Sequence, residues 1–213
     1  MSLGEAWRIL IEDAHLLVVE KDTGLLSVPG LGAENADCLV ARVQGHFPGA
    51  RIVHRLDRDT SGLMVLALDA QTHRDLSREF EQRRVQKEYE ALVWGDVAES
   101  SGTIDLPIRK DMTAKTKHLV DHVHGKPSQT DWWRLELGAD GSASRLRLEP
   151  RTGRSHQLRL HLSSIGHPIL GDPIYGSEHS RTAAPRLCLH ATRLEFTHPR
   201  TGAQVLAQSS APF

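Results

Sequence analysis

The residues best suited to chemistry lie in "HRLDRDTSG", residues 54–62, where four charged side chains stand between two apolar segments. An aspartate after a strand-like segment is most often a turn or capping residue. Asp57 has a second interpretation, because Arg55 lies two positions earlier and shares its face if the segment is extended. A nearby cation favours the ionised carboxylate, the form that acts as a nucleophile. Asp57 is therefore our first candidate catalytic residue.

The elements around Asp57 must place it at the edge of a sheet. The apolar runs "HLLVVEK" (15–21) and "GLMVLAL" (62–68) predict strands, and "RIVHRLD" (51–57) predicts an extended segment between them. A helix is expected over 37–47. A second one is expected to begin after Asp69 as N-cap and to run to about Arg83.

The rest of the chain reads mainly as strands. "VQKEYEALVWG" (85–95) predicts a strand, and residues 116–150 have the short strands and turns of an antiparallel meander. A helix is expected from Ser155 as N-cap to a stop at Gly166, followed by final strands over 185–208. Strands outnumber helices without regular alternation, which favours the α+β class over a doubly wound fold.

Composition sets further limits. The chain has 213 residues, of which 39% are hydrophobic and 25% charged, so a soluble globular protein is expected. We find no apolar run of transmembrane length and no signal peptide, and we expect a cytoplasmic protein. Cys38 and Cys188 are expected to be ordinary free thiols.

The net charge is −1, yet basic residues cluster locally. Arg83 and Arg84 belong to "RDLSREFEQRRVQK" (74–87), and "IRKDMTAKTKH" (108–118) has four basic residues, Lys115 among them, against one acid. A third run, "SRLRLEPRTGRSHQLR" (144–159), has five arginines against one acid, Glu149. Three such runs in a neutral chain favour a side that faces a polyanion.

Four segments resemble the RluA-type pseudouridine synthases, in the order in which that family has them. They are "HRLDRDTSGLMVLAL" (54–68), "QKEYEALVWG" (86–95), "EPRTGRSHQLRLHLSSIGHPILGDPIYG" (149–176) and "RLCLHATRLEFTHPRTG" (186–202). With "HLLVVEKDTGLLSVPG" (15–30), the resemblance covers nearly the whole chain. It implies the pseudouridine synthase fold, a mixed and mainly antiparallel bent sheet flanked by helices and loops. We expect one catalytic domain over residues 1–213, with two lobes around a central cleft and no S4-type RNA-binding domain.

The resemblance also implies the reaction, which is isomerisation of specific uridines to pseudouridine in structured RNA. Uracil leaves its ribose, rotates and is rejoined through carbon. Since no atom is gained or lost, no redox cofactor is expected, and the resemblance implies that no metal is needed. The family's aspartate falls on Asp57. Whether it attacks the sugar, attacks the ring or removes a ribose proton, it must be ionised.

Further site residues are carried over from the family. Arg154 matches the arginine that pairs with the aspartate, and Leu158 matches an aliphatic residue that packs on the base. Tyr89 matches the tyrosine that stacks on the uracil, although a tyrosine in a strand more often fills the core. Arg55 falls where a side chain occupies the gap left by a flipped nucleotide.

The partner implied is RNA, with no membrane and no DNA, and the protein is expected to be a monomer. Within the family the chain most resembles the short dual-specificity members, which act on a 23S rRNA hairpin and a tRNA anticodon stem-loop. Arg83, Arg84 and the run 108–118 are candidates for gripping that RNA.

Two other functions use the same residues. "DRDT" resembles the start of magnesium-dependent aspartyl phosphatases, with Asp57 and Asp59 as the paired acids, but the threonine comes one position too early. A non-catalytic RNA-binding module explains the arginines but not a carboxylate among them. The histidine pairs at 122/124 and 156/161 lack the acids or cysteines of a metal site.

Overall fold

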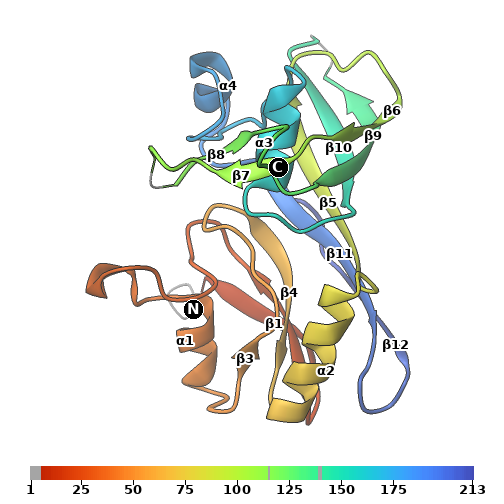
Figure 1. Cartoon of the computed structure of the whole chain (residues 1–213). Helices are drawn as coiled ribbons and strands as arrows, with labels where there is room; N and C mark the ends of the chain where they lie inside the picture. The colour runs from red at the N-terminus through yellow and green to blue at the C-terminus, as the bar shows by residue number, and fades with distance from the viewer. Residues whose placement is uncertain (1–5, 115, 139–140) are drawn as a thin grey trace. The chain divides into compact units, whose positions relative to one another are not determined.

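The computed structural model describes residues 6–114, 116–138 and 141–213 and divides the chain into two compact units (Figure 1). Unit 1 contains Met1–Lys87 and His190–Pro212, and unit 2 contains Glu88–Leu189 with Phe213. The chain passes between the units within β5 (Gln86–Trp94) and β11 (Leu189–Thr197). In the part of the chain that is described, no helix has both the length and the apolar character to cross a membrane.

Unit 1 is a sheet with two helices. Its strands lie in the order β1-β2-β4-β11, with β3 paired to β4 and β12 paired to β11. The pairing of β4 with β11 is parallel, and the others within this unit are antiparallel. The element bounds are β1 Trp7–Glu12, β2 Leu16–Lys21, a short 3₁₀ turn η1 Ala33–Asn35, α1 Leu39–Gln44, β3 Arg51–Ile52, β4 Ser61–Ala67, α2 Ala70–Glu81 and β12 Gln204–Gln208.

Strand β4 is the centre of unit 1, because all seven of its residues are buried. Leu63 and Val65 pack with Leu76 of α2 in one hydrophobic cluster. On the other face, the segment after β2 approaches the strand, where the Ser27 hydroxyl lies 3.5 Å from the sulfur of Met64. Apolar side chains on both faces of β4 therefore bring α2 and the segment after β2 against one strand.

In unit 2 the strands lie in the order β5-β10-β9-β6, and each neighbouring pair is antiparallel. Strands β7 and β8 form a separate hairpin. Residues 157–162 of α3 are all buried, and Leu158 and Leu162 belong to the main hydrophobic cluster of this unit. The element bounds are β6 Ser101–Asp105, β7 Ile108–Lys110, β8 His118–Val120, β9 Gln129–Leu137, β10 Ala143–Pro150, α3 Gln157–Ser164 and α4 Glu178–Thr182.

Several local predictions are confirmed. Asp69 caps α2, since its carboxylate accepts the amides of Gln71 and Thr72 at 2.9 and 2.8 Å. The strands predicted at 15–21, 62–68 and 85–95 are β2, β4 and β5. Cys38 and Cys188 are free and buried.

Two local predictions are wrong. The segment 51–57 is extended only at Arg51–Ile52, so the argument that placed Arg55 and Asp57 on one strand face loses its basis. The N-cap position of α3 is His156, not Ser155, and His156 makes no side-chain capping bond and has the left-handed φ of 57°. The expected division into two lobes around a cleft within one catalytic domain stays a prediction.

Candidate active site

Asp57 lies in the loop that joins β3 to β4 and is half-buried. Its carbonyl accepts the Thr60 amide at 3.2 Å, which closes a turn just before β4 begins. The preceding residue, Leu56, is buried, and both of its backbone groups are bound by one side chain. The Ser27 hydroxyl donates to the Leu56 carbonyl at 2.7 Å and accepts its amide at 3.1 Å. The loop is thus fixed one residue before the carboxylate.

The residues after Asp57 are held by the turn that follows β2. Lys21 is fully buried, and its ammonium donates to the carbonyl of Arg58 at 3.0 Å and to two carbonyls of the 22–25 turn at 2.8 Å each. The hydroxyl of Thr23 donates to the Asp59 carbonyl at 2.7 Å. These contacts bind the backbone on the other side of the carboxylate, so that its position is set from both directions.

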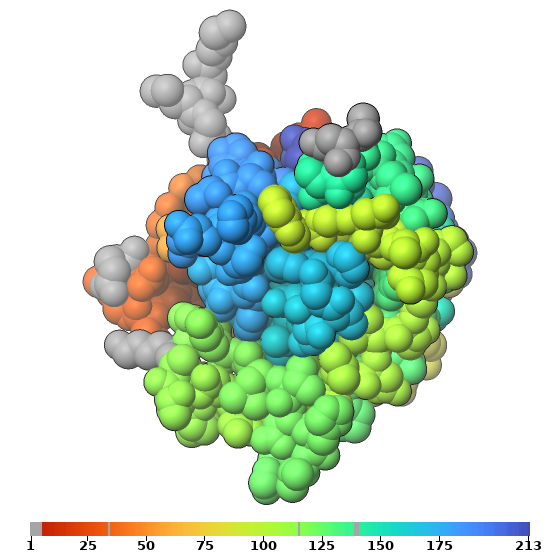
Figure 2. Space-filling view, turned by 90° about the horizontal axis from the view of Figure 1, so that it is seen from above, coloured from red at the N-terminus to blue at the C-terminus, as the bar shows by residue number. Residues whose placement is uncertain are grey.

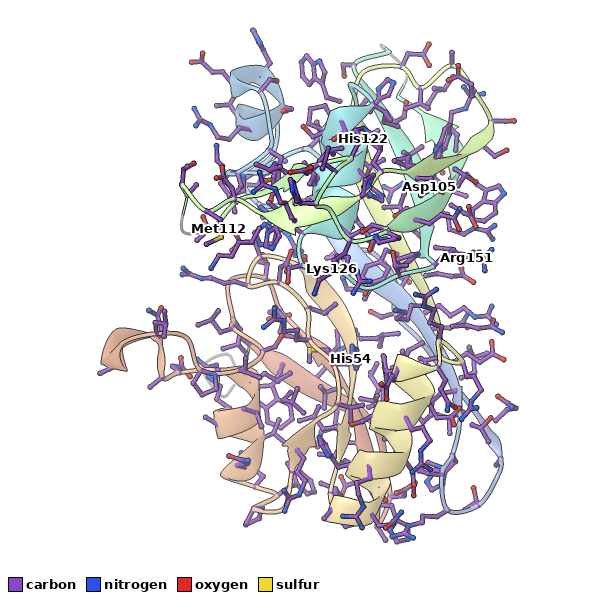
Figure 3. All side chains as sticks on the ribbon, viewed as in Figure 1. His54, Asp105, Met112, His122, Lys126 and Arg151 are labelled. Carbon is purple, nitrogen blue, oxygen red and sulfur yellow. The ribbon has the colours of Figure 1, made fainter. Side chains whose placement is uncertain are left out.

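His54 forms a third attachment of the loop. Nε2 of His54 accepts the Val65 amide at 3.1 Å. Val65 lies on β4 between the residues that pair with β3 and those that pair with β11. The His54 ring stacks on the ring of Phe80 in α2, and the two ring centroids lie 4.4 Å apart (His54 is labelled in Figure 3). Burial, and then the charge of Lys87, lower the pKa of His54 to about 3. His54 is therefore neutral at physiological pH, as an acceptor nitrogen must be.

The start of β4 requires a glycine. Gly62 has φ of 115°, and a Cβ there would lie 2.4 Å from the carbonyl oxygen of Ala191 in the parallel strand β11. The neighbouring Ser61 hydroxyl lies 2.8 Å from Nδ1 of His190, whose Nε2 lies 2.9 Å from the Ser209 hydroxyl. Close approach of β11 thus fixes the point at which the Asp57 loop enters the sheet.

Three predicted site residues belong to unit 2. Tyr89 lies in β5 opposite Leu148 of β10, and its half-buried ring packs against the cluster that contains Leu158. Leu158 itself is only 7% exposed. The structure therefore brings Tyr89 and Leu158 to the same hydrophobic core. The ion pair expected between Asp57 and Arg154 stays a prediction.

Arg154 is exposed and lies in the loop between β10 and α3. Its amide donates to Oε1 of the buried Gln157 at 3.0 Å. On the other side of this loop, Nδ1 of His156 lies 2.9 Å from the Tyr175 hydroxyl. That hydroxyl also accepts the His118 amide of β8 at 2.9 Å. The Arg154 loop is therefore held both by α3 and by the turn that contains Tyr175.

A buried ion pair supports that turn. The guanidinium of Arg159 binds both carboxylate oxygens of Asp172 at 2.7 and 2.8 Å. The carboxylate also accepts the amides of Ile174 and Tyr175 at 2.8 and 3.1 Å. Burial alone would raise the pKa of Asp172, but Arg159 and the two amides lower it below its usual value. The pair thus keeps its charges and orients the backbone of Tyr175.

The candidates for RNA contact lie at the surface. Arg55 and Arg83 are exposed, and Arg84 is held in an ion pair with Glu79. The segment from β7 to β8 projects from unit 2 (green in Figure 2), with Met112 84% exposed near its turn. Lys115, part of that basic run, lies outside the described residues.

Sequence reasoning missed the residues that hold the loops. Lys21 and Gln157 carried a usable signal, because each is a polar residue in an otherwise buried stretch of its element. Ser27 and His54 carried little, since their partners lie 29 and 11 residues away. Among the described residues, no group of three or more histidines, cysteines or acids is arranged to hold a metal.

Comparison with known proteins gives consistent results. A family model described as RNA pseudouridylate synthase matches residues 15–164. The chain is 45% identical over 210 residues to the dual-specificity RNA pseudouridine synthase RluA of Escherichia coli K12, covering 98% of this chain and 95% of that protein. The protein of the same name from Yersinia pestis is 45% identical over 205 residues, covering 96% of this chain and 99% of the relative.

Solved structures show the same fold. The human RNA pseudouridylate synthase domain containing 1 is 34% identical with a TM-score of 0.82, covering 100% of this chain and 87% of that one. The human RNA pseudouridylate synthase domain containing 4 is 27% identical with a TM-score of 0.74, covering 96% of this chain and 88% of that one.

The chain belongs to the RNA pseudouridylate synthase family. It is an isomerase that converts uridine to pseudouridine in RNA, and its relatives include the bacterial RluA enzymes. The predicted α+β class and pseudouridine synthase fold are confirmed. Family membership overturns the phosphatase and the non-catalytic RNA-binding module as alternatives.

Proposed function

We propose that this enzyme modifies specific uridines in two RNAs, a 23S rRNA hairpin and a tRNA anticodon stem-loop. The bacterial relatives that match it over nearly their whole length are named dual-specificity enzymes, which supports two substrates. We further propose that it works in the cytoplasm as a monomeric, single catalytic domain. The reaction is proposed to start at Asp57 and to need no metal or cofactor.

The observation that carries the assignment of Asp57 is the binding of its loop. Side chains of Ser27, Lys21 and Thr23 hold the backbone before and after Asp57. A turn on the surface does not need three such attachments. A nucleophile or base does, because a displacement of about 1 Å in a reacting group can cost a hundredfold in rate.

The proposed chemistry assigns a role to each residue. The N1–C1′ bond of uridine breaks and a C5–C1′ bond forms, after which N1 holds a proton and the C5 proton goes to water. Asp57, ionised, starts this exchange, and Arg154 is its ion-pair partner. Tyr89 stacks on the uracil and assists loss of the C5 proton, while Leu158 supports the base. Arg55 fills the gap left by the flipped nucleotide.

The test compares two aspartates of the same turn. The Asp59 carbonyl accepts a hydrogen bond from Thr23, and that bond survives replacement of its carboxylate. Asp57→Asn and Asp59→Asn should both fold, as judged by circular dichroism. Turnover is measured as tritium release from [5-³H]uridine-labelled stem-loops of each type, with EDTA present.

We expect Asp57→Asn to lose about a thousandfold or more in turnover, because its amide has no charge with which to start the exchange. Asp59→Asn should stay within about twofold of the original enzyme, since it keeps the loop attachments. Normal turnover by Asp57→Asn would refute the assignment. Release from one RNA alone would refute the two-substrate proposal.

A further inference from the structure

A continuous chain of hydrogen bonds runs through the interior of unit 2 and ends at the amide of Arg154. It starts at the Leu106 carbonyl, which lies 3.0 Å from Nε2 of His161. Nδ1 of His161 lies 3.0 Å from the Thr130 hydroxyl. That hydroxyl accepts from Nε2 of Gln157 at 3.0 Å. Oε1 of Gln157 then accepts the Arg154 amide at 3.0 Å.

The direction of every bond in this chain is fixed by its ends. A carbonyl only accepts, so Nε2 of His161 must carry the proton. In the neutral ring Nδ1 is then an acceptor, and the Thr130 hydroxyl must donate to it. The lone pairs of that hydroxyl are left for the amide of Gln157, whose oxygen therefore faces Arg154. Each group has one role, and none can reverse without breaking a neighbour's bond.

The same glutamine has every polar group of its side chain occupied. Its Nε2 also donates to the Gln129 carbonyl at 2.9 Å, and its Oε1 also accepts the Thr152 hydroxyl at 2.7 Å. Thr152 in turn accepts the amide of Gln129 at 2.9 Å. Gln157 therefore ties the start of β9 to the loop that carries Arg154.

Burial makes this arrangement costly to change. His161 and Thr130 are fully buried, and Gln157 is 3% exposed. Water cannot replace a lost partner at such sites, so each missing bond leaves an unsatisfied polar group. Burial also lowers the pKa of His161, which keeps the ring neutral and the chain intact at physiological pH. By contrast, Arg151 lies at the surface of the same region (Figure 3) and pairs with Asp131 at 2.6 Å.

We propose that Gln157, oriented by Thr130 and His161, is a positioning residue that sets the backbone of Arg154 for the reaction. None of the three touches RNA in this role. The inference depends on the catalytic role proposed above for Arg154. It predicts that removing the Thr130 hydroxyl lowers kcat through Arg154, although that hydroxyl reaches the Arg154 amide only through the side chain of Gln157.

The test uses Thr130→Val, which keeps the shape but removes the hydroxyl, and Thr130→Ser, which keeps it. Ser128→Ala is the matched control, because Ser128 is a buried hydroxyl on the same segment that donates to the Lys126 carbonyl, whereas both Nε2 donors of Gln157 go to Gln129 and Thr130. kcat and KM are measured separately on an RNA stem-loop, below the unfolding temperature of each variant. If Thr130→Val does not fold, Thr152→Val and Thr152→Ser replace the pair.

We expect Thr130→Val to lower kcat by about ten- to a hundredfold with little change in KM, as for a small displacement of a reacting group. Thr130→Ser and Ser128→Ala should keep kcat near the original value. In an Arg154→Ala background, Thr130→Val should cause no further loss, because both changes act on one group.

An unchanged kcat in Thr130→Val, or an equal loss in the presence and absence of Arg154, would overturn the inference. If Arg154→Ala alone leaves kcat intact, the proposed role of Arg154 fails instead. That result is distinguishable from the first, because it does not depend on Thr130.

Discussion

At the residue scale, the protonation state of His54 decides whether the Asp57 loop keeps its attachment to β4. The acceptor nitrogen is lost when the ring is protonated, and burial together with Lys87 lowers the pKa of His54 to about 3. An unfolded histidine has a pKa near 6.5. The unfolded chain therefore binds this proton more readily, and the contribution of His54 to stability is complete above about pH 6.5 and declines as the pH falls towards 3.

This linkage predicts a change in pH dependence for His54→Asn, which retains an acceptor oxygen but cannot titrate. Between pH 6 and 4 the unfolding free energy of the original protein should fall by about 1.4 kcal/mol per pH unit more than that of the variant. Urea unfolding of both proteins at several pH values measures the difference. Parallel curves over this range would contradict the assignment of a neutral, buried ring.

At the element scale, the parallel contact between β4 and β11 depends on one position without a side chain. Gly62→Ala places a Cβ against the backbone of Ala191, which cannot move without disturbing β11, and also requires an unfavourable φ. We expect a loss of about 3 kcal/mol or more in unfolding free energy. Gly202→Ala is the control, because Gly202 also has a positive φ of 73° but no atom within 4 Å of a new Cβ.

The control should cost only about 1–2 kcal/mol, the strain of the left-handed conformation alone. Denaturant unfolding of the two variants gives both numbers. Equal losses would mean that backbone strain, and not the contact with β11, determines the need for glycine at the start of β4.

The elements also show where sequence reasoning works. Helix α2 is predicted from its N-cap, Asp69, and this is a local property that the fold keeps. Strand β3 stops at Ile52 because the side chain of His54, not the backbone, takes the next free amide of β4. At the start of α3, where Ser155 was expected as N-cap, the Gln157 side chain binds the Arg154 amide and His156 takes the N-cap position. Tertiary contacts of this kind leave no periodic trace in the sequence.

The candidate site divides in the same way. Asp57 could be found from the charges next to it, and the family resemblance supplied Tyr89 and Arg154. The side chains that hold them, Ser27 and Gln157, are ordinary residue types whose function comes only from partners brought close by folding.

At the scale of the whole molecule, the net charge of −1 gives no general attraction to RNA, so that binding must come from local clusters. The two arginines after α2, Arg83 and Arg84, differ in whether their charge is available to bind a phosphate. Arg84 is paired with Glu79, whereas the exposed side chain of Arg83 makes no hydrogen bond or ion pair with the described residues. A phosphate gains more from Arg83, because the charge of Arg84 is already partly neutralised.

We therefore predict unequal effects on the salt dependence of RNA binding. In an Asp57→Asn background that prevents turnover, Arg83→Gln should lower the slope of log Kd against log salt by about one, and Arg84→Gln by less. Arg8→Gln is the control, since it removes the same charge from β1, where Arg8 pairs with Glu20. Filter binding of a stem-loop at several salt concentrations measures the slopes. If Arg8→Gln lowers the slope as much as Arg83→Gln, the change reflects total charge, and the segment after α2 does not contact RNA.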